Sequence, residues 1–248
     1  MINSDLRGIV EFSPNNWVLL LDVPNKVKEE LSSVLKSILE NKENSISVNS
    51  DTHYQIQEQY RVHYPDSFFN FFSEVLLEWE DRIKAKYVSE IEHLDFTNYG
   101  LGQFGTFSEW SEKYGGVALQ KKYEYIPPHI RHAHLSFTLW HKVPYGFAEE
   151  TATCPSPNAS GKKRGAYSNG TDSFFYNTKQ TNNYWNKSIP NMAIGLDKVD
   201  IPSSKIYEGV IGIYPSHLMH SANPFYSSDQ EKIFFFGDVI FKKTTTII

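Results

Sequence analysis

The chain has 248 residues and a net charge of −5 with no long block of one sign, which disfavours a surface that coats nucleic acid. Its single cysteine, Cys154, cannot form an internal disulfide, and the N-terminal residues lack the apolar run of a signal peptide. No apolar stretch approaches the ~20 residues of a membrane-spanning helix. We therefore expect a single domain over residues 1–248, located in a reducing cytoplasm.

The first third of the chain predicts one strand and two helices. Residues 17–23 form a short apolar run closed by Pro24, which is typical of a strand that ends in a turn. From Asn25 onward, apolar residues recur at three- and four-residue spacing, as an amphipathic helix requires. A second stripe of this kind follows Asp66 and Ser67, which can cap a helix. Both helices are expected to cover a sheet.

Beyond residue 95 the pattern changes to short apolar runs divided by Gly, Pro and Asn clusters, without a further helix period. The 17 Phe and 15 Tyr also suit the interior of a sandwich or barrel. Residues 150–170 carry little apolar material and are expected to form an exposed loop. The fold class is therefore α+β, mainly β, with covering helices in residues 1–95 and a β core in residues 96–243. Strands are expected at residues 117–125, 135–143, 173–178, 209–214 and 232–241.

Histidines gather in two places, and their spacing indicates a metal site. His129, His132, His134 and His141 surround the start of one expected strand, and His220 follows another. Residues two apart in an extended chain point to the same side, so His132 and His134 share one face, while His129 shares a face with its second neighbour. Either pair can project inward. Non-haem Fe(II) sites need two histidines and one carboxylate, and a two-apart pair with a distant histidine suits that geometry.

Two blocks of sequence carry a resemblance. The first, residues 120–145, contains His129-Ile-Arg-His-Ala-His-Leu-Ser-Phe, and the second contains Tyr214-Pro-Ser-His-Leu-Met-His-Ser and Lys232-Ile-Phe-Phe-Phe-Gly-Asp. In order and spacing they resemble the ligand strands of phage and marine-bacterial 2-oxoglutarate/Fe(II) oxygenase-like proteins, over roughly residues 98–242. The resemblance implies a double-stranded β-helix, which is a jelly-roll or cupin-like core, with Fe(II) and 2-oxoglutarate as cofactors. It implies that His220 is the distal ligand and that Lys232 binds the distal carboxylate of 2-oxoglutarate.

The chain departs from the family pattern at three positions. That pattern is His-x-His, then an acid after a short gap, then Ser-Phe. His129 fits the first histidine, but Arg131 stands where the second is expected and His134 where the acid is expected. A guanidinium cannot ligate iron and repels a divalent cation. Lys232 replaces the usual arginine, and it holds a carboxylate as a point charge without a bidentate fork. The alternative for Lys232 is a solvated charge on an edge strand.

Several ligand sets stay open. His132 and His134 restore a two-apart pair one residue along, and with His220 they would give a three-histidine site for Fe, Zn or Cu. Glu149 or Asp172 can instead complete the shell from a loop.

Three functions stay open as well. The resemblance implies a 2-oxoglutarate/Fe(II)-dependent oxygenase that hydroxylates an unidentified substrate and releases succinate and carbon dioxide. Arg131 and Lys232 suit a catalytically degenerate member that serves as a binding or structural part, for example of a phage particle. A ligand-binding jelly roll with a non-redox metal would keep the histidines without needing Lys232. The expected partner is a small-molecule co-substrate, with no nucleic acid or membrane. Homo-oligomer or virion assembly stays open, and so does a location in a host cytoplasm.

Overall fold

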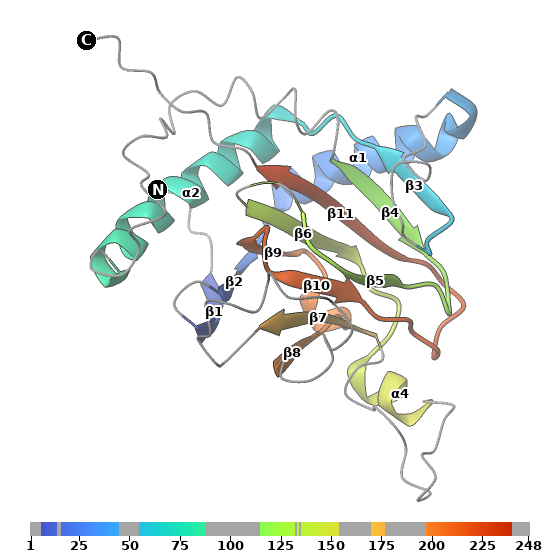
Figure 1. Ribbon diagram of the computed structural model, residues 1–248. Helices are drawn as coiled ribbons and strands as arrows, with labels where there is room; N and C mark the ends of the chain where they lie inside the picture. Colours follow the sequence, from blue (N-terminus) through green and yellow to red (C-terminus); the bar gives the residue numbers. More distant parts are fainter. Residues whose placement is uncertain are drawn as a thin grey trace, which may run out of the picture.

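The computed structural model describes residues 6–13, 16–44, 55–87, 115–131, 133, 135–153, 170–176 and 197–239. These residues form two antiparallel sheets and two long helices, so the chain is mainly β as expected. Both long helices pack on one face of the larger sheet, and the smaller sheet covers the other face (Figure 1). The helices are α1 Asn25–Glu40 and α2 Asp66–Tyr87, with the short α4 Phe147–Ala152, η1 Lys42–Asn44 and η5 Lys205–Tyr207.

The larger sheet has seven strands in the order β1-β2-β9-β6-β11-β4-β3. All of its neighbouring strands are antiparallel. The bounds of its strands are β1 Leu6–Ser13, β2 Asn16–Asp22, β3 Glu58–Arg61, β4 Gly116–Gln120, β6 Leu135–Lys142, β9 Val210–Pro215 and β11 Lys232–Val239.

The smaller sheet has four antiparallel strands in the order β5-β10-β7-β8. Between them, the two sheets place the last eight strands in the orders β4-β11-β6-β9 and β5-β10-β7-β8. Two interleaved Greek keys produce these orders, so the sandwich is of the jelly-roll type. The bounds of the smaller sheet's strands are β5 Ile126–His129, β7 Thr171–Tyr176, β8 Asp197–Pro202 and β10 Met219–Ala222.

Both expected helices are confirmed, and they pack on the larger sheet through apolar stripes. In α1 the buried residues Val27, Leu31 and Leu35 recur every four residues, as the sequence predicts. Each such side chain stabilises the fold by roughly 1.5–3 kcal/mol when it leaves water. None of the helices in the described part of the chain is long and apolar enough to span a bilayer.

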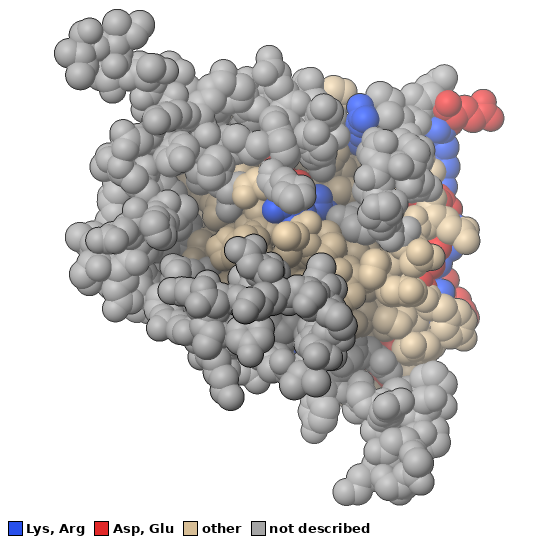
Figure 2. All heavy atoms as spheres, in the orientation of Figure 1, with Lys and Arg blue, Asp and Glu red and all other residues tan. Residues whose placement is uncertain are grey.

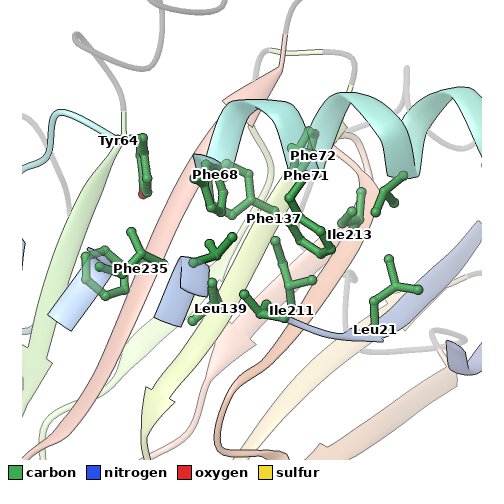
Figure 3. Close-up of a cluster of buried hydrophobic side chains, with 14 of the residues drawn as sticks. Leu21, Tyr64, Phe68, Phe71, Phe72, Phe137, Leu139, Ile211, Ile213 and Phe235 are labelled. Carbon is green, nitrogen blue, oxygen red and sulfur yellow. The ribbon is translucent and has the colours of Figure 1, made fainter. Parts of the chain in front are cut away.

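The first turns of α2 hold the aromatic centre of this core. Figure 3 shows Phe68 and Phe72 pointing from the helix toward Phe137 on the sheet, and the ring centroids of both lie 5.3 Å from that of Phe137. Ser67, which was expected to cap the helix, lies inside the first turn and donates a hydrogen bond to Glu30 of α1 at 2.5 Å. It therefore ties the two helices together.

β11 separates this core from the interior of the sandwich, because successive strand residues point to opposite sides. Ile233 and Phe235 face the helices, whereas Phe234 and Phe236 face the smaller sheet. Lys232 shares the side of Phe234 and is completely buried. β11 lies between β4 and β6, so the alternative of a solvated edge-strand charge for Lys232 is wrong.

The strand expected over residues 117–125 is wrong at its C-terminal end. β4 stops at Gln120, and a turn follows in which the amide of Glu124 donates to the carbonyl of Lys121 at 3.1 Å. Tyr123 in this turn has a φ of 74°, a left-handed conformation that is incompatible with a strand. The chain then enters the smaller sheet as β5.

The other expected strands are confirmed, with small shifts at their ends. They correspond to β2, β6, β7, β9 and β11, of which β7 begins two residues earlier than expected, at Thr171. β1, β3, β5, β8 and β10 were not expected. Of these, β3, β5 and β10 have four residues, which are too few to display an alternating pattern.

We expected no helix beyond residue 95 and an exposed loop from residue 150. Both expectations are wrong at α4. α4 covers the start of that loop, and Glu150 within it is only 1% exposed. Its carboxylate accepts hydrogen bonds from the amides of Tyr226 and Ser227 at 2.7 and 2.8 Å. Satisfying two backbone donors explains why a charged residue is buried here. Residues 154–169 lie outside the described part of the chain.

Charged side chains of the described surface form a network at one margin of the sheet. Glu58 accepts hydrogen bonds from Lys42 at 2.5 Å and from Lys121 at 2.7 Å, and these bonds lower its pKa to about 2. Figure 2 shows blue and red atoms gathered mainly along the right margin of this face, whereas described atoms near the centre are mostly tan. The network is solvated, so its contribution to stability is small.

Candidate functional site

Two of the expected metal ligands, His129 and His220, lie side by side in the smaller sheet. They are register partners across β5 and β10, and the next pair in register is Ala222 with Ile126. Three residues of β5 therefore oppose two of β10, which is a β-bulge that adds one residue to β5. The bulge lets His129 share the inner face with Ile126. The imidazole centroids are 4.3 Å apart with an interplanar angle of 53°.

Hydrogen bonds to main-chain carbonyls orient both rings. Nδ1 of His129 lies 3.0 Å from the carbonyl oxygen of Pro127, and Nδ1 of His220 lies 2.9 Å from that of Leu218. A carbonyl only accepts, so each Nδ1 carries the proton in a neutral ring and Nε2 carries the lone pair. A bond of this kind is typical of metal-ligating histidines, in which it fixes the ring and its tautomer.

The surroundings of the pair keep both imidazoles neutral. Burial and the positive charge of Arg131 lower the pKa of His129 to about 4. Hydrogen bonds to the backbone of Pro127 and His220 act the other way, but they offset only part of this shift. Burial also lowers the pKa of His220 well below its ordinary value, with further contributions from His129 and Arg131. A metal ligand must be neutral imidazole, so the pair is in the required state at neutral pH.

Aromatic side chains form the wall behind the pair. The ring of Tyr214 lies 4.8 Å from that of His220, centroid to centroid, and the ring of Phe174 lies 6.2 Å away in a stacked arrangement. The hydroxyl of Tyr214 is 3.1 Å from Oγ1 of Thr138, which satisfies this buried polar group. Tyr214 and Phe174 belong to the hydrophobic core, which leaves the histidines as the polar groups of this wall.

Arg131 lies beyond the end of β5, and a carboxylate holds it in place. Its Nη1 is 3.2 Å from Oδ2 of Asp238, and Ser136 donates to the other oxygen of Asp238 at 2.6 Å. The guanidinium carbon also lies 5.2 Å from the centroid of the Phe236 ring. The amide of Arg131 donates to the carbonyl of Ser216 at 2.9 Å. The position where the resemblance implies a ligand is thus occupied by a fixed cation.

Lys232 lies in a second closed polar cluster. Its Nζ is 3.3 Å from both carboxylate oxygens of Asp172 and 3.1 Å from Oγ of Ser203. Trp140 and Ser203 donate further hydrogen bonds to Asp172. Burial lowers the pKa of Lys232, while the charge of Asp172 and its hydrogen bond oppose this shift. The lysine that was expected to anchor a carboxylate is therefore buried, faces the interior and is already paired with Asp172.

Among the remaining sequence candidates that the structure describes, none joins the histidine pair. His141 faces the helices, where its ring lies 5.3 Å from that of Phe235. Glu149 accepts a hydrogen bond from the amide of Gly146 at 3.0 Å, at the start of α4. Asp172, the other acid considered, is engaged by Lys232, so neither expected carboxylate completes the shell. His132 and His134 lie outside the described residues.

The residues that the structure describes contain no group of three or more His, Cys, Asp and Glu side chains that could hold a metal ion. His129 and His220 could therefore offer two ligand positions at most, and any third protein ligand would have to come from outside the described residues. Two neutral imidazoles suit Fe, Zn or Cu, whereas the nearby guanidinium opposes a dication. The two imidazoles therefore fit a metal ion, whereas the guanidinium of Arg131 does not.

Two acidic partners were missed by sequence reasoning. Asp238 lies on the same face of β11 as Lys232, six residues along, so the period of two could have placed it in the interior. Asp172 was considered as a metal ligand rather than as the partner of a lysine. No local signal pairs it with a residue 60 positions away, because that contact depends on how β7 packs across from β11.

Comparisons with known proteins give remote structural likeness alone. No protein-family profile matches the chain. No curated protein matches its sequence. Among solved structures, it is similar to a prolyl-4-hydroxylase of Pseudomonas putida with a TM-score of 0.44 and 12% identity, over 89% of this chain and 90% of that one. Activity cannot be transferred across so remote a likeness.

Proposed function

We propose that this protein is a double-stranded β-helix of the 2-oxoglutarate/Fe(II)-dependent oxygenase type, which hydroxylates an unidentified substrate. The observation that carries the proposal is the pair of neutral imidazoles of His129 and His220, held side by side on the inner face of the smaller sheet. Neutral histidines oriented through Nδ1 are what a non-haem iron centre requires. The strand order supports the same fold, since it matches a jelly roll.

In this proposal His129 and His220 hold Fe(II), and the segment with His132 and His134 supplies a third ligand. When bound with 2-oxoglutarate, the iron supplies the oxygen activation for hydroxylation of a C–H bond. The chain's own residues do the rest. Tyr214 and Phe174 exclude water behind the pair, and the carbonyls of its Nδ1 partners hold the rings in orientation.

Lys232 binds the distal carboxylate of 2-oxoglutarate in this proposal. It is the buried cation of the interior, and a carboxylate is already its partner. The pairing with Asp172 places a carboxylate within ion-pair distance of the ammonium group, as the assignment requires of the co-substrate. The pairing with Asp172 also sets a condition on co-substrate binding. The co-substrate has to displace the carboxylate of Asp172, so its affinity is expected to be low.

A second candidate is a catalytically degenerate protein of the same fold that binds or assembles without turnover. It is favoured by the two internal ion pairs, Arg131 with Asp238 and Lys232 with Asp172, which neutralise both cations without any ligand. A binding role in a host cytoplasm or in a virion belongs to this candidate. Unlike the oxygenase, this candidate needs neither a metal ion nor 2-oxoglutarate.

Metal content after anaerobic loading with Fe(II) tests the proposal. The wild-type protein is expected to retain about one metal ion per chain, as a single mononuclear site would. His220→Gln should lose the metal, whereas His141→Gln serves as the matched control because its ring faces the helices. A wild-type protein that retains no metal contradicts the oxygenase and leaves the second candidate. Equal loss in both variants would contradict the assignment of His220.

A further inference from the structure

A cavity of about 570 Å³ lies on the helix side of the larger sheet, away from the histidine pair. It is lined by α1, by the end of β6 and the residues after it, by the segment that follows η5, and by the start of β11. His141 and Ile233 face it, and they point to the opposite side of the sheet from Trp140 and Lys232. The sheet therefore separates this cavity from the interior of the sandwich.

The cavity gathers positive charge. Lys28, Lys142 and Lys205 line it, and the carboxylate among its lining residues is that of Glu208. Glu208 accepts a hydrogen bond from the amide of Val143, another lining residue, at 3.1 Å, so three lysines face one carboxylate and positive charge is in excess. In the described part of the chain, none of these three lysines has a carboxylate within ion-pair distance. Three like charges around one concavity repel one another unless an anion neutralises them.

The backbone at the rim accommodates one of these lysines closely. Gly209 has a φ of +80°, and a Cβ atom built on it would lie 2.8 Å from Cδ and 3.3 Å from Nζ of Lys28. A side chain at position 209 would therefore be strained and would push Lys28 away. The glycine lets the lysine lie across the rim, half-buried, with its ammonium group next to the cavity.

Neutral polar groups complete the lining. Oγ of Ser32 donates to the carbonyl of Lys28 at 2.7 Å and lies 3.3 Å from Nε2 of His141, so these two groups partner each other in the wall. Gln230 adds an amide from the loop before β11. Leu35, Val143 and Ile233 supply apolar surface. The cavity is open to solvent and its lining is about equally polar and apolar, and its volume falls in the usual range of roughly 300–1,000 Å³ for small-molecule sites.

We propose that this cavity binds a small organic anion with two or more negative charges, such as a phosphate ester or a polycarboxylate. Lysine ammonium groups act as point charges with several donors, so they suit a compact polyanion rather than one planar carboxylate. A single negative charge would leave most of the repulsion among the lysines in place. The site is independent of the proposed oxygenase function, because it shares no lining residue with the histidine pair.

Calorimetric titration of the full chain with pyrophosphate and with citrate tests this proposal, with acetate as the monoanion arm. Saturable binding of pyrophosphate or citrate at one site, weakened by added salt, is the expected result. Lys28→Gln and the double change Lys142→Gln with Lys205→Gln should each weaken the dissociation constant by about tenfold or more. Acetate should bind at least about tenfold more weakly than either polyanion.

Lys36→Gln is the matched control, because Lys36 lies on the same helix, does not line the cavity, and sits 3.8 Å from Glu40. It should leave polyanion binding unchanged, and so should His220→Gln. No saturable binding of either polyanion would overturn the proposal. Equal weakening by Lys28→Gln and Lys36→Gln would also overturn it, since a nonspecific charge effect would then explain the binding. Thermal melting of each variant checks that the fold is retained.

Discussion

The ammonium group of Lys232 lies 3.3 Å from both carboxylate oxygens of Asp172, inside the sandwich. The lysine is completely buried and the aspartate is 7% exposed. A buried cation without a carboxylate partner is costly, so the interior always has to contain one. Asp172 supplies it in the structure, and a ligand carboxylate would have to take its place.

We predict that Asp172→Asn destabilises the fold, because it leaves the Lys232 charge buried without a counterion. The free energy of unfolding should fall by roughly 3–5 kcal/mol, and denaturation by urea measures it. Asp229→Asn is the control, since Asp229 forms an exposed pair with Lys122 at 3.1 Å and should cost less than about 1 kcal/mol. Similar losses in the two variants would show that the buried pair contributes no more than a surface pair.

We make a second prediction for Asp172→Asn, which concerns the binding of dicarboxylates. If 2-oxoglutarate uses Lys232, it should raise the melting temperature of Asp172→Asn more than that of the wild type, because it no longer competes with an internal carboxylate. Succinate, which keeps the distal carboxylate but lacks the keto acid, should give a smaller shift. A variant that responds to neither dicarboxylate would argue that Lys232 has a structural role alone.

The sequence predicted the two long helices and five of the strands, because these show local periodicity or apolar runs, but it missed β1, which has eight residues. Val27, Leu31 and Leu35 repeat every four residues, and β11 alternates between two cores. The early end of β4 was missed, since the left-handed Tyr123 carries none of the usual Gly or Asn signals of a turn.

For the site, the sequence singled out His129, His220 and Lys232, of which the structure brings the two histidines together and buries the lysine, while their roles stay predictions. It also identified Arg131 as a departure from the family pattern. It could not find the partners of the two cations. Asp238 lies 107 residues from Arg131, and the contact exists only because β11 packs beside β6 and near the end of β5. Such pairs follow from topology rather than from local pattern.

We predict a pH dependence of stability that comes from the histidine pair. The folded pKa of His129 is about 4, below its ordinary 6.5, so the unfolded chain binds a proton in this window that the folded chain does not. The free energy of unfolding of the metal-free protein should therefore fall as the pH falls from 6.5 toward 4, by an amount on the order of 3 kcal/mol for this residue. His220 acts in the same direction.

Urea denaturation at several pH values measures this slope. His129→Gln should flatten it, because the variant lacks the group that titrates only in the unfolded state. His141→Gln should flatten it less, since the charge of Glu208 opposes the lowering of the His141 pKa by burial. A slope that is the same in wild type and His129→Gln would contradict a buried, neutral His129.

We predict that Arg131→His tightens metal binding, because it removes a cation whose charge lowers the pKa of both histidines and adds a potential ligand. Arg131→Leu separates these two effects, since it removes the charge without adding a ligand. Both variants should raise the pKa of His129 and His220 in an NMR titration, and affinity for Co(II) should rise more in Arg131→His. Unchanged histidine pKa values would show that Asp238 already neutralises the guanidinium at the site.

The most direct test of the proposed function is an anaerobic titration of the purified protein with Fe(II) and then 2-oxoglutarate, followed by visible absorption. We predict a charge-transfer band that saturates with 2-oxoglutarate, that is absent in His220→Gln, and that reaches saturation at lower concentration in Asp172→Asn. A wild-type protein that gives no band at any 2-oxoglutarate concentration, while remaining folded, would contradict the oxygenase and favour the degenerate binding protein.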